Sequence, residues 1–543
     1  MKVKFADTIL INGRFLTMEE DYPTAEAVAI AGERILYVGT ENEARKFATE
    51  GTEIIDLEGR VAAPGLIECH THVVSYAVRF CNVNVAGEKT RSLSAVLAAL
   101  KERAERRAKG EWIVAEGYDE SKFAEGPIEI TKEMLDEVAP EHPVLLRRTC
   151  GHICVLNSLA LKLSNFTDDS VDPEAGGHFF RDEKGRLTGM ISESLQRQVP
   201  FELPSTETIA ESFLSGTQRE FFEKGITAAT EMELRARALK PLELLDRKGQ
   251  LKLKVGFNVA GHRNSVYEPM LQQVEDLGIQ SGFGSAHLRF MGLKFIMDGS
   301  TGGKTAAFAI PSRDDPENYG ELNYKQEDLN RDILKAARTG AQVSIHAIGD
   351  RAIEMAITAL EYANENGADI PHRRVRLEHL ESPSPEQIER IKKLNVVVAL
   401  SAAFIYALGD SHLNVLGYDR TVDAFPAKSL MDSGIVVGCN SDCPVCDVNP
   451  MRGIYAMVTR KTEKGQSFGG EKQAIDRIRA LEAYTRNSAY IICREDELGT
   501  LKAGKFADIV VFEDDYLNVP EESLKDIKVY MTLSDGEIVY RKK

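Results

Sequence analysis

The sequence lacks any apolar run approaching the ~20 residues that are needed to cross a bilayer, so no membrane-spanning helix is expected. It is also short of basic residues, with 67 lysines and arginines against 84 aspartates and glutamates, which gives a net charge of −17. Such an acidic chain does not favour general binding to nucleic acid or to an anionic membrane surface. The 43% hydrophobic and 28% charged content is typical of a globular enzyme-sized protein.

Cysteine is sparse: eight residues are spread over 543 positions, which is not the disulfide framework of a small secreted protein. The first residues, MKVKFADTILINGRF, contain no uninterrupted apolar segment and no small-residue cleavage site of a secretory signal. We therefore expect a cytoplasmic protein.

Both ends of the chain have short strand patterns separated by glycine turns, and neither end has enough strands to close a core by itself. We expect residues 1–64 and 495–543 to form one composite β-sandwich, with the main domain inserted between them.

The middle of the chain alternates short apolar runs with helical stretches, which is the pattern of a parallel sheet covered on both faces. The predicted strands are 65–70, 226–232, 254–261, 289–297, 342–348, 374–380, 396–402 and 435–442. Eight such units indicate an α/β fold, a (β/α)₈ TIM barrel over 65–80 and 216–494, with an open doubly wound sheet as the alternative. Gly340 and Gly434 stand where helix C-terminal caps are expected.

About 150 residues separate the first two predicted strands, far more than a βα connection needs. This stretch has its own strand and helix patterns, so we expect residues 81–215 to form an insertion domain that caps the barrel mouth. Loops on that face build the active sites of such barrels, and the insertion should therefore influence substrate choice.

Histidines stand at several predicted strand ends. His70 and His72 are two residues apart, so on a strand both rings point to one face, although chance could produce such a pair. His346 and His379 end the fifth and sixth strands, and Asp442 ends the eighth. A lone histidine at such a position is usually not a ligand, but four on one face with a carboxylate suit Zn²⁺ or a similar divalent ion.

Lys294 lies inside the apolar fourth strand, RFMGLKFIM. An unpaired ammonium there would be costly, unless its head reaches solvent at the strand end. The sequence by itself leaves both possibilities open.

These residues lie in a set of motifs: APGLIECHTH, MGLKFIMDGSTGGKTA, SIHAIGDRA, RLEHLE, NSDCPV and LGTLKAGKFADIVVF. With them the chain resembles the amidohydrolase superfamily of metal-dependent hydrolases over nearly its whole length. Within the superfamily it is most similar to the branch of the N-substituted formamide deformylases.

The resemblance implies roles for the matching positions. His70 and His72 would bind one metal, His346 and His379 a second, and Lys294 would carry a CO₂-derived carbamate that bridges the two. Asp442 would contact the first metal and handle protons. His152, in the insertion, matches a Gly-His pair of the branch and would face the substrate, with a structural histidine as the alternative. One or two Zn²⁺ ions per chain are expected, with Mn²⁺, Fe²⁺ and Co²⁺ as alternatives.

The implied reaction is hydrolysis of a C–N bond in an amide, N-substituted formamide or cyclic amide by a metal-activated hydroxide. Deaminases of this class place a glutamate three residues after the fifth-strand histidine, where this chain has Gly349, so deamination is a less favoured alternative. Hydrolysis of an ester or a lactone is a second alternative. The non-enzymatic alternative is a ligand-binding or assembly homologue without catalysis. The substrate would be a small molecule, and a homodimer is expected because dimers are the commonest closed assembly.

Two further motifs favour structural interpretations over catalytic or nucleotide-binding ones. Cys443 and Cys446 form a CxxC, but no second CxxC exists to complete a zinc site, so two thiols or a structural disulfide are favoured over redox catalysis. The segment GSTGGKT resembles a phosphate-binding loop, but Asp298 stands where its first glycine is required. We predict a loop after the fourth strand and no ATP site.

Overall fold

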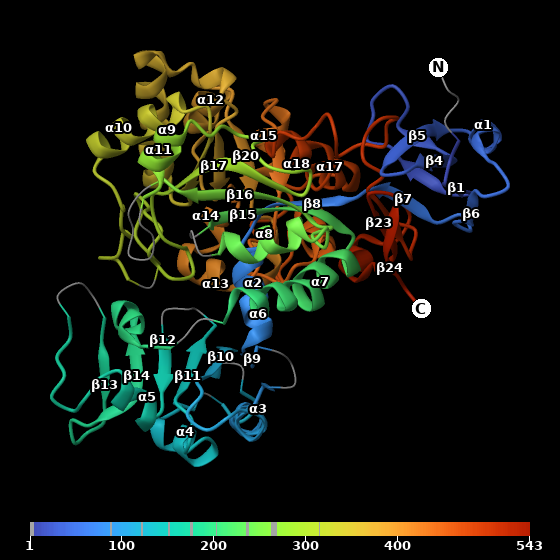
Figure 1. Cartoon of the computed structure of the whole chain (residues 1–543). Coiled ribbons are helices and arrows are strands. Elements are labelled where there is room, and N and C mark those ends of the chain that lie inside the picture. Colours follow the sequence, from blue (N-terminus) through green and yellow to red (C-terminus); the bar gives the residue numbers. More distant parts are fainter. Residues whose placement is uncertain are drawn as a thin grey trace. The chain divides into compact units, whose positions relative to one another are not determined.

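The computed structural model describes residues 5–86, 90–120, 123–126, 128–149, 153–173, 177–201, 204–234, 238–261, 269–313 and 315–543 (Figure 1). The chain divides into two compact units, one of residues 1–74 with 214–543 and the other of residues 75–213. The terminal strands and the barrel fall in the same unit, so the three-part boundaries drawn from the sequence stay a prediction.

The larger unit is built on a parallel sheet of eight strands in sequence order. Its strands are β8 (Leu66–Thr71), β15 (Ile226–Leu234), β16 (Lys254–Ala260), β17 (Leu288–Ile296), β18 (Gln342–Ala347), β19 (Arg376–His379), β20 (Val397–Leu400) and β21 (Val437–Cys439). Each of the eight predicted strands contains or overlaps one of these, which confirms the α/β class and the TIM-like barrel sheet.

Contacts between β8 and β21 bring the two ends of this sheet together. The backbone N–H of His72 donates to the Cys443 carbonyl at 2.7 Å, and the backbone N–H of Ser441 donates to the Glu68 carboxylate at 2.8 Å. The Cys69 thiol donates to the Cys439 carbonyl at 3.3 Å. The sheet is therefore a nearly closed barrel, and the residues that follow β8 and β21 become neighbours.

Helices connect the barrel strands. They are α7 (Arg219–Glu223), α8 (Leu239–Arg247), α9 (Leu271–Leu277), α10 (Gln326–Arg338), α11 (Asp350–Ala363), α12 (Pro385–Lys393), α13 (Ala403–Leu416), α14 (Tyr418–Thr421), α15 (Ala427–Asp432), α16 (Pro450–Thr459), α17 (Arg477–Ala483) and α18 (Arg486–Ile491).

Local sequence fixes where several of these helices begin and end. At the start of α12, Ser384 and Gln387 form a capping box, in which each side chain binds the other residue's backbone N–H. Gly340 and Gly434 lie two residues beyond α10 and α15 with φ of 84° and 89°, a conformation that glycine adopts without a Cβ penalty. Both C-terminal caps predicted from the sequence are confirmed.

Strands from the two ends of the chain form two further sheets. One is β5–β4–β1–β6, of strands Arg34–Gly39, Ala27–Ala31, Thr8–Ile11 and Glu53–Asp56; α1 (Glu41–Ala44) follows β5. The other is β24–β23–β22–β7–β2–β3, of strands Glu537–Arg541, Val529–Ser534, Ile509–Phe512, Val61–Pro64, Arg14–Leu16 and Thr24–Ala25.

Pairing of β22 with β7 joins the last strands of the chain to the first, and in Figure 1 the red C-terminal strands lie beside the blue N-terminal ones. Buried side chains of both sheets belong to one hydrophobic cluster, which includes Leu10, Val28, Phe15 and Met531. Apolar surface of both sheets is thus buried in a common core.

The smaller unit has its own mixed sheet, in the order β13–β14–β12–β11–β10–β9. Its strands are Phe179–Arg181, Leu187–Ser192, Ile153–Leu156, Val144–Arg148, Ile113–Tyr118 and Val83–Asn84; its helices are α3 (Leu93–Arg106), α4 (Lys132–Val138), α5 (Ser158–Leu163) and α6 (Thr206–Ser212). Helix α2 (Val73–Cys81) runs into this unit from β8. Side chains such as Val96, Leu100 and Leu146 form a core within the unit.

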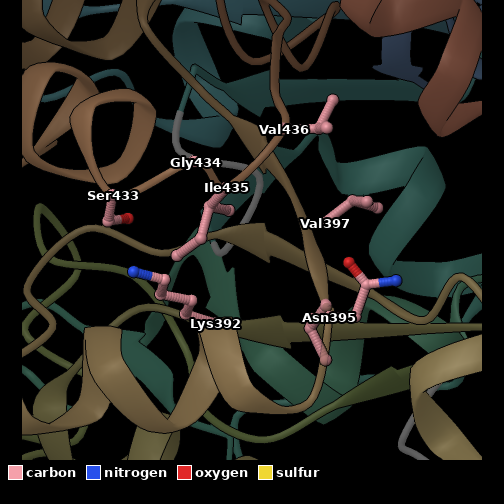
Figure 2. Close-up of a pocket in the computed structure, with 8 residues that line it drawn as sticks. Lys392, Asn395, Val397, Ser433, Gly434, Ile435 and Val436 are labelled. Carbon is pink, nitrogen blue, oxygen red and sulfur yellow. The ribbon is translucent and has the colours of Figure 1, made fainter.

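A cavity of about 310 Å³ lies at the beginning of β20 and β21 (Figure 2). It is lined by Val397 at the start of β20, by Lys392 and Asn395 before that strand, and by Ser433 and Ile435 before β21. Parallel barrels carry their active sites at the opposite, carboxyl ends of the strands, so this cavity is not a candidate active site. Among the described residues, no helix has the length and apolarity that a bilayer crossing would require.

Candidate functional site

The four histidines predicted as ligands gather at the carboxyl ends of the barrel strands. The ring centroids of His70 and His72, both at the end of β8, are 5.7 Å apart. The ring of His379, from β19, lies 4.7 Å from His70 and 4.5 Å from His346, which comes from β18. Residues more than 300 positions apart in the sequence therefore form one imidazole cluster, as the strand-end pattern predicts.

Asp442 joins this cluster from the loop after β21. Its Oδ1 lies 3.4 Å from Nε2 of His70 and 3.3 Å from Nε2 of His72. Ligand atoms of His70, His379 and Asp442 all lie within 4.8 Å of one another. The same Oδ1 is buried and has no hydrogen-bond partner among the described residues, which is costly unless another group, such as a metal ion, binds it.

Two of these residues have an unusual backbone conformation. His379 has φ of 69° and Asp442 has φ of 53°, and Leu380 follows His379 with φ of 42°. Non-glycine residues in this left-handed region cost about 1–3 kcal/mol each and occur most often at functional sites. In a regular strand successive side chains point to opposite faces, so His379 would point away from the barrel interior, where Glu378 points. The turn at His379 interrupts this alternation.

Each histidine uses one ring nitrogen for a contact outside the cluster. Nδ1 of His70 lies 2.7 Å from the Glu378 carboxylate, and Nδ1 of His72 lies 2.9 Å from the Met232 carbonyl. Nδ1 of His379 lies 2.8 Å from the Ser401 hydroxyl. Such contacts fix the ring orientation and leave the other nitrogen, Nε2, for a metal.

His346 is oriented the other way round. Its Nε2 lies 3.0 Å from the Gly299 carbonyl and 3.3 Å from the Asp298 carboxylate, which leaves Nδ1 for the cluster. Asp298 also accepts hydrogen bonds from the backbone N–H groups of Ala307, Ile348 and Gly349. The glycine-rich loop after β17 and the end of β18 are therefore held together by one buried carboxylate beside His346.

Lys294 lies in β17 with an exposed fraction of 2%, so its head does not reach solvent at the strand end. Its positive charge lowers the pKa of His70 and of His379, and also that of Asp442. These effects place the lysine head next to the same cluster. A carbamate on this side chain would exchange the buried cation for a further carboxylate ligand.

The electrostatics of the cluster suit a cation. Burial, followed by the Lys294 charge, holds the pKa of His70 well below its ordinary value; burial and the neighbouring rings of His346 and His70 do the same for His379. Burial would raise the pKa of Asp442, but His70 and His72 outweigh it and lower that pKa. Burial would lower the pKa of His72, but the Asp442 carboxylate outweighs it and raises that pKa. A cation beside Asp442 is thus favoured, and the neutral imidazoles of His70 and His379 with an ionised carboxylate are the forms that bind Zn²⁺, so the donor set fits a divalent metal.

The remaining predicted positions have different outcomes. His152 lies outside the described residues. Cys443 and Cys446 are buried and form no disulfide, so of the two interpretations favoured from the sequence the structure has the two thiols. The loop predicted after the fourth strand follows β17, and within it the Thr301 hydroxyl donates to the buried Glu381 carboxylate at 2.8 Å.

Sequence reasoning missed the charged residues that support the histidines, chiefly Arg376, Glu378 and Asp298. Glu231 was missed as well; its carboxylate accepts the backbone N–H of Val74 at 2.8 Å, and its other oxygen lies 3.9 Å from Nδ1 of His72. A signal for these residues was present in the sequence, since segments such as RVRLEHL carry charged residues inside an apolar strand pattern. A charged side chain that is fully buried requires a partner.

Comparison with known proteins now decides the family. The model of the amidohydrolase family matches residues 53–540. The chain belongs to this family. This amidohydrolase is 30% identical to the YtcJ amidohydrolase of Bacillus subtilis (strain 168), over 98% of each chain, and 25% identical to the N-substituted formamide deformylase of Arthrobacter pascens, over 99% of this chain and 98% of the other.

Among solved structures, the amidohydrolase resembles a metal-dependent hydrolase from Pyrococcus horikoshii, with a TM-score of 0.77 and 27% identity over 95% of this chain and 99% of the other. The predictions of the superfamily and of an amidohydrolase enzyme are confirmed.

Proposed function

We propose that this amidohydrolase is a metal-dependent hydrolase that cleaves a C–N bond in an amide, N-substituted formamide or cyclic amide. The observation that carries the proposal is Oδ1 of Asp442, which is buried at the barrel mouth without a hydrogen-bond partner among the described residues and lies within 3.4 Å of Nε2 of both His70 and His72. The similarity to a named N-substituted formamide deformylase over nearly the whole chain supports this bond type.

The metal would be held by His70, His72 and Asp442, and a second ion by His346 and His379, with a carbamate on Lys294 between them. Imidazole and carboxylate donors favour Zn²⁺, with Mn²⁺, Fe²⁺ or Co²⁺ as alternatives. When bound, such an ion acts as a Lewis acid and lowers the pKa of a bound water to about 7.

Asp442 is the residue that would move the proton. Its lowered pKa keeps the carboxylate ionised at neutral pH, so it can accept a proton from the attacking water. The same carboxyl group would return that proton to the amine nitrogen as the C–N bond breaks. The net reaction consumes one water and one amide and releases an acid and an amine.

Gly349 argues against the deaminase alternative. A Cβ built at this position would lie 2.0 Å from the backbone carbonyl oxygen of Ala307, so the close packing leaves no room for a glutamate side chain. Ester or lactone hydrolysis would use the same residues and is the second candidate. A non-catalytic homologue is disfavoured because all six expected positions carry side chains that can act as ligands or ligand precursors.

The proposal extends to the domain boundaries, the substrate contacts and the assembly of the enzyme. Residues 1–64 with 495–543 would form the composite sandwich, and residues 81–215 would cap the barrel mouth and contribute substrate contacts, including His152. We also propose that the enzyme is a cytoplasmic homodimer that acts on a small molecule.

The experiment combines metal analysis with a hydrolysis screen over N-formyl, N-acyl and cyclic amide compounds. We expect at least one divalent ion per chain, hydrolysis of one of these classes, and a loss of about 10²–10⁴-fold in Asp442→Asn. Asp447→Asn is the matched control, since Asp447 is an exposed carboxylate in the same loop. Only trace metal in the wild-type protein, together with unchanged hydrolysis in Asp442→Asn, would refute the proposal.

The bridging role of Lys294 has its own test. Lys294→Ala should bind one ion fewer per chain than the wild type, because the bridging ligand is removed. An unchanged metal count would rule out the carbamate.

A further inference from the structure

A fully buried ion pair lies inside the barrel beneath the histidine cluster. Arg376 and Glu378 stand two residues apart on β19, so both side chains point to the same face of the strand, and both have an exposed fraction of 0%. The guanidinium uses two nitrogens: Nε donates to Oε1 of Glu378, and Nη2 donates to Oε2 at 2.9 Å. This two-point contact fixes the plane of the carboxylate.

The pair contacts β8 at two points. Oε2 of Glu378 lies 2.7 Å from Nδ1 of His70, and Nη2 of Arg376 also donates to the backbone carbonyl of Cys69, the residue before His70. One guanidinium therefore holds both the carboxylate that contacts the imidazole and the backbone from which that imidazole projects. Rotation of the His70 ring would break the contact with Glu378, and displacement of its backbone would break the contact with Arg376.

The other three histidines of the cluster have different partners. His72 has a backbone carbonyl and His379 a hydroxyl, while His346 has a carbonyl at 3.0 Å and a carboxylate only at 3.3 Å. Of the four histidines in the cluster, His70 alone has a carboxylate of a described residue closer than 3 Å to the ring nitrogen that faces away from the cluster. A contact to a charged group is stronger and more directional than one to a neutral group.

The energetic cost of this arrangement points to a role beyond folding. Burying two charges in a barrel interior carries a desolvation penalty that their mutual attraction barely offsets, and apolar residues of similar size are often at least as stabilising. We infer that Arg376 and Glu378 are a positioning pair that orients His70 and raises the affinity of its half of the site for a divalent metal ion. This inference rests on the proposed function, since it requires His70 to be a ligand.

The first test is Glu378→Gln, which keeps the shape of the side chain but removes its charge. Zn²⁺ and Co²⁺ affinities are measured by competition with a chromophoric chelator, and the melting temperature is measured on metal-free protein. We expect metal affinity at the tightest site to fall by about 10- to 100-fold. The melting temperature of the metal-free protein should fall as well, because the Arg376 guanidinium is left buried without its carboxylate. Equal affinity in wild type and variant would overturn the inference.

The second test separates positioning from folding stability. In Arg376→Met/Glu378→Leu, we expect metal-free protein to melt at or above the wild-type temperature, while metal affinity falls as in Glu378→Gln. A lower melting temperature with unchanged metal affinity would show that the pair is structural and would overturn the inference. The matched control is Lys254→Met/Asp508→Leu, which removes another buried ion pair that contacts no residue of the site, and it should leave metal affinity unchanged.

The wild-type measurement distinguishes the two proposals. Wild-type protein that binds no divalent metal would refute the proposed function and this inference with it. Wild-type protein that binds metal as tightly as both variants do would refute the positioning role alone.

Discussion

Two buried charge clusters in the larger unit use similar chemistry at opposite ends of the barrel strands. Glu378 lies near the carboxyl end of β19 and contacts His70, and Arg376, the first residue of that strand, binds Glu378 and the Cys69 carbonyl. Lys254 is the first residue of β16, with an exposed fraction of 1%, and its ammonium lies 2.9 Å from Asp508 and 2.7 Å from Asp535. The first cluster contacts His70, which we propose as a metal ligand, whereas the second connects the C-terminal strands to the base of the barrel.

This difference shows that the role of a buried ion pair depends on the residues that it contacts. Asp508 precedes β22 and Asp535 follows β23, and His287 adds a further contact of 2.7 Å to Asp535. Breaking this second cluster should therefore cost stability and spare the site. Replacing both members of the first by apolar residues should weaken metal binding and spare stability.

The largest effect on stability is expected from Lys254→Met. It leaves the Asp508 and Asp535 carboxylates buried without their shared cation, which should lower the free energy of unfolding by about 3–5 kcal/mol. Urea denaturation of metal-free protein measures this loss, and metal affinity should not change. Lys252→Met, which removes a partly exposed ion pair with Glu537, is the control and should cost less than about 1 kcal/mol. Equal losses in the two variants would contradict the assigned role of Lys254.

A smaller, pH-dependent effect is expected at Asp535. Burial would raise the pKa of this carboxyl, but the hydrogen bond with His287 and the Lys254 charge lower it from 3.8 to about 2. The stabilisation is fully present above about pH 4 and is lost as the pH falls toward 2, because the unfolded chain then binds a proton that the folded protein does not bind.

Asp535→Asn removes this titration. Between pH 5 and pH 2, the wild-type free energy of unfolding should fall by about 2 kcal/mol more than that of Asp535→Asn. Urea denaturation across this range measures both curves. Curves that fall in parallel would show that the carboxyl makes no contribution.

The smallest effect is expected from Ser401→Ala beside His379. The Ser401 hydroxyl contacts Nδ1 of His379 and donates to Oδ1 of Asn440 at 2.9 Å. The groups that orient His379 here are therefore uncharged. We expect a loss of about 1 kcal/mol of stability and a drop in metal affinity of less than about tenfold, below that of Glu378→Gln. Chelator competition compares the two variants directly. A larger loss in Ser401→Ala would reverse the ranking of charged and neutral support.

Local patterns in the sequence predicted most of the barrel and the candidate ligands. Apolar runs with helices between them located all eight strands, because each run must be buried on both faces of a parallel sheet. His70, His72, His346 and His379 were found because strand ends on the same face of a barrel must converge. Lys294 was noticed because a cation in an apolar strand requires an explanation.

The supporting contacts could not be read from the sequence. Arg376 and Glu378 were visible as charges within a strand, but the contact of Glu378 with His70 joins positions 308 residues apart. The left-handed φ of His379 and Asp442 was also invisible, since neither residue type requires it. Gly349 looked only like a missing glutamate, whereas the structure gives the reason, which is its close approach to the Ala307 carbonyl.

The sequence alone therefore determined the class of fold, the strand ends and the candidate metal ligands, because these follow from local periodicity and from residue type. Only the tertiary structure decided which nitrogen of each histidine is left for a metal, which charges are paired, and which buried pair supports the site. Those properties depend on distances between side chains from different strands, and such distances are set by closure of the barrel.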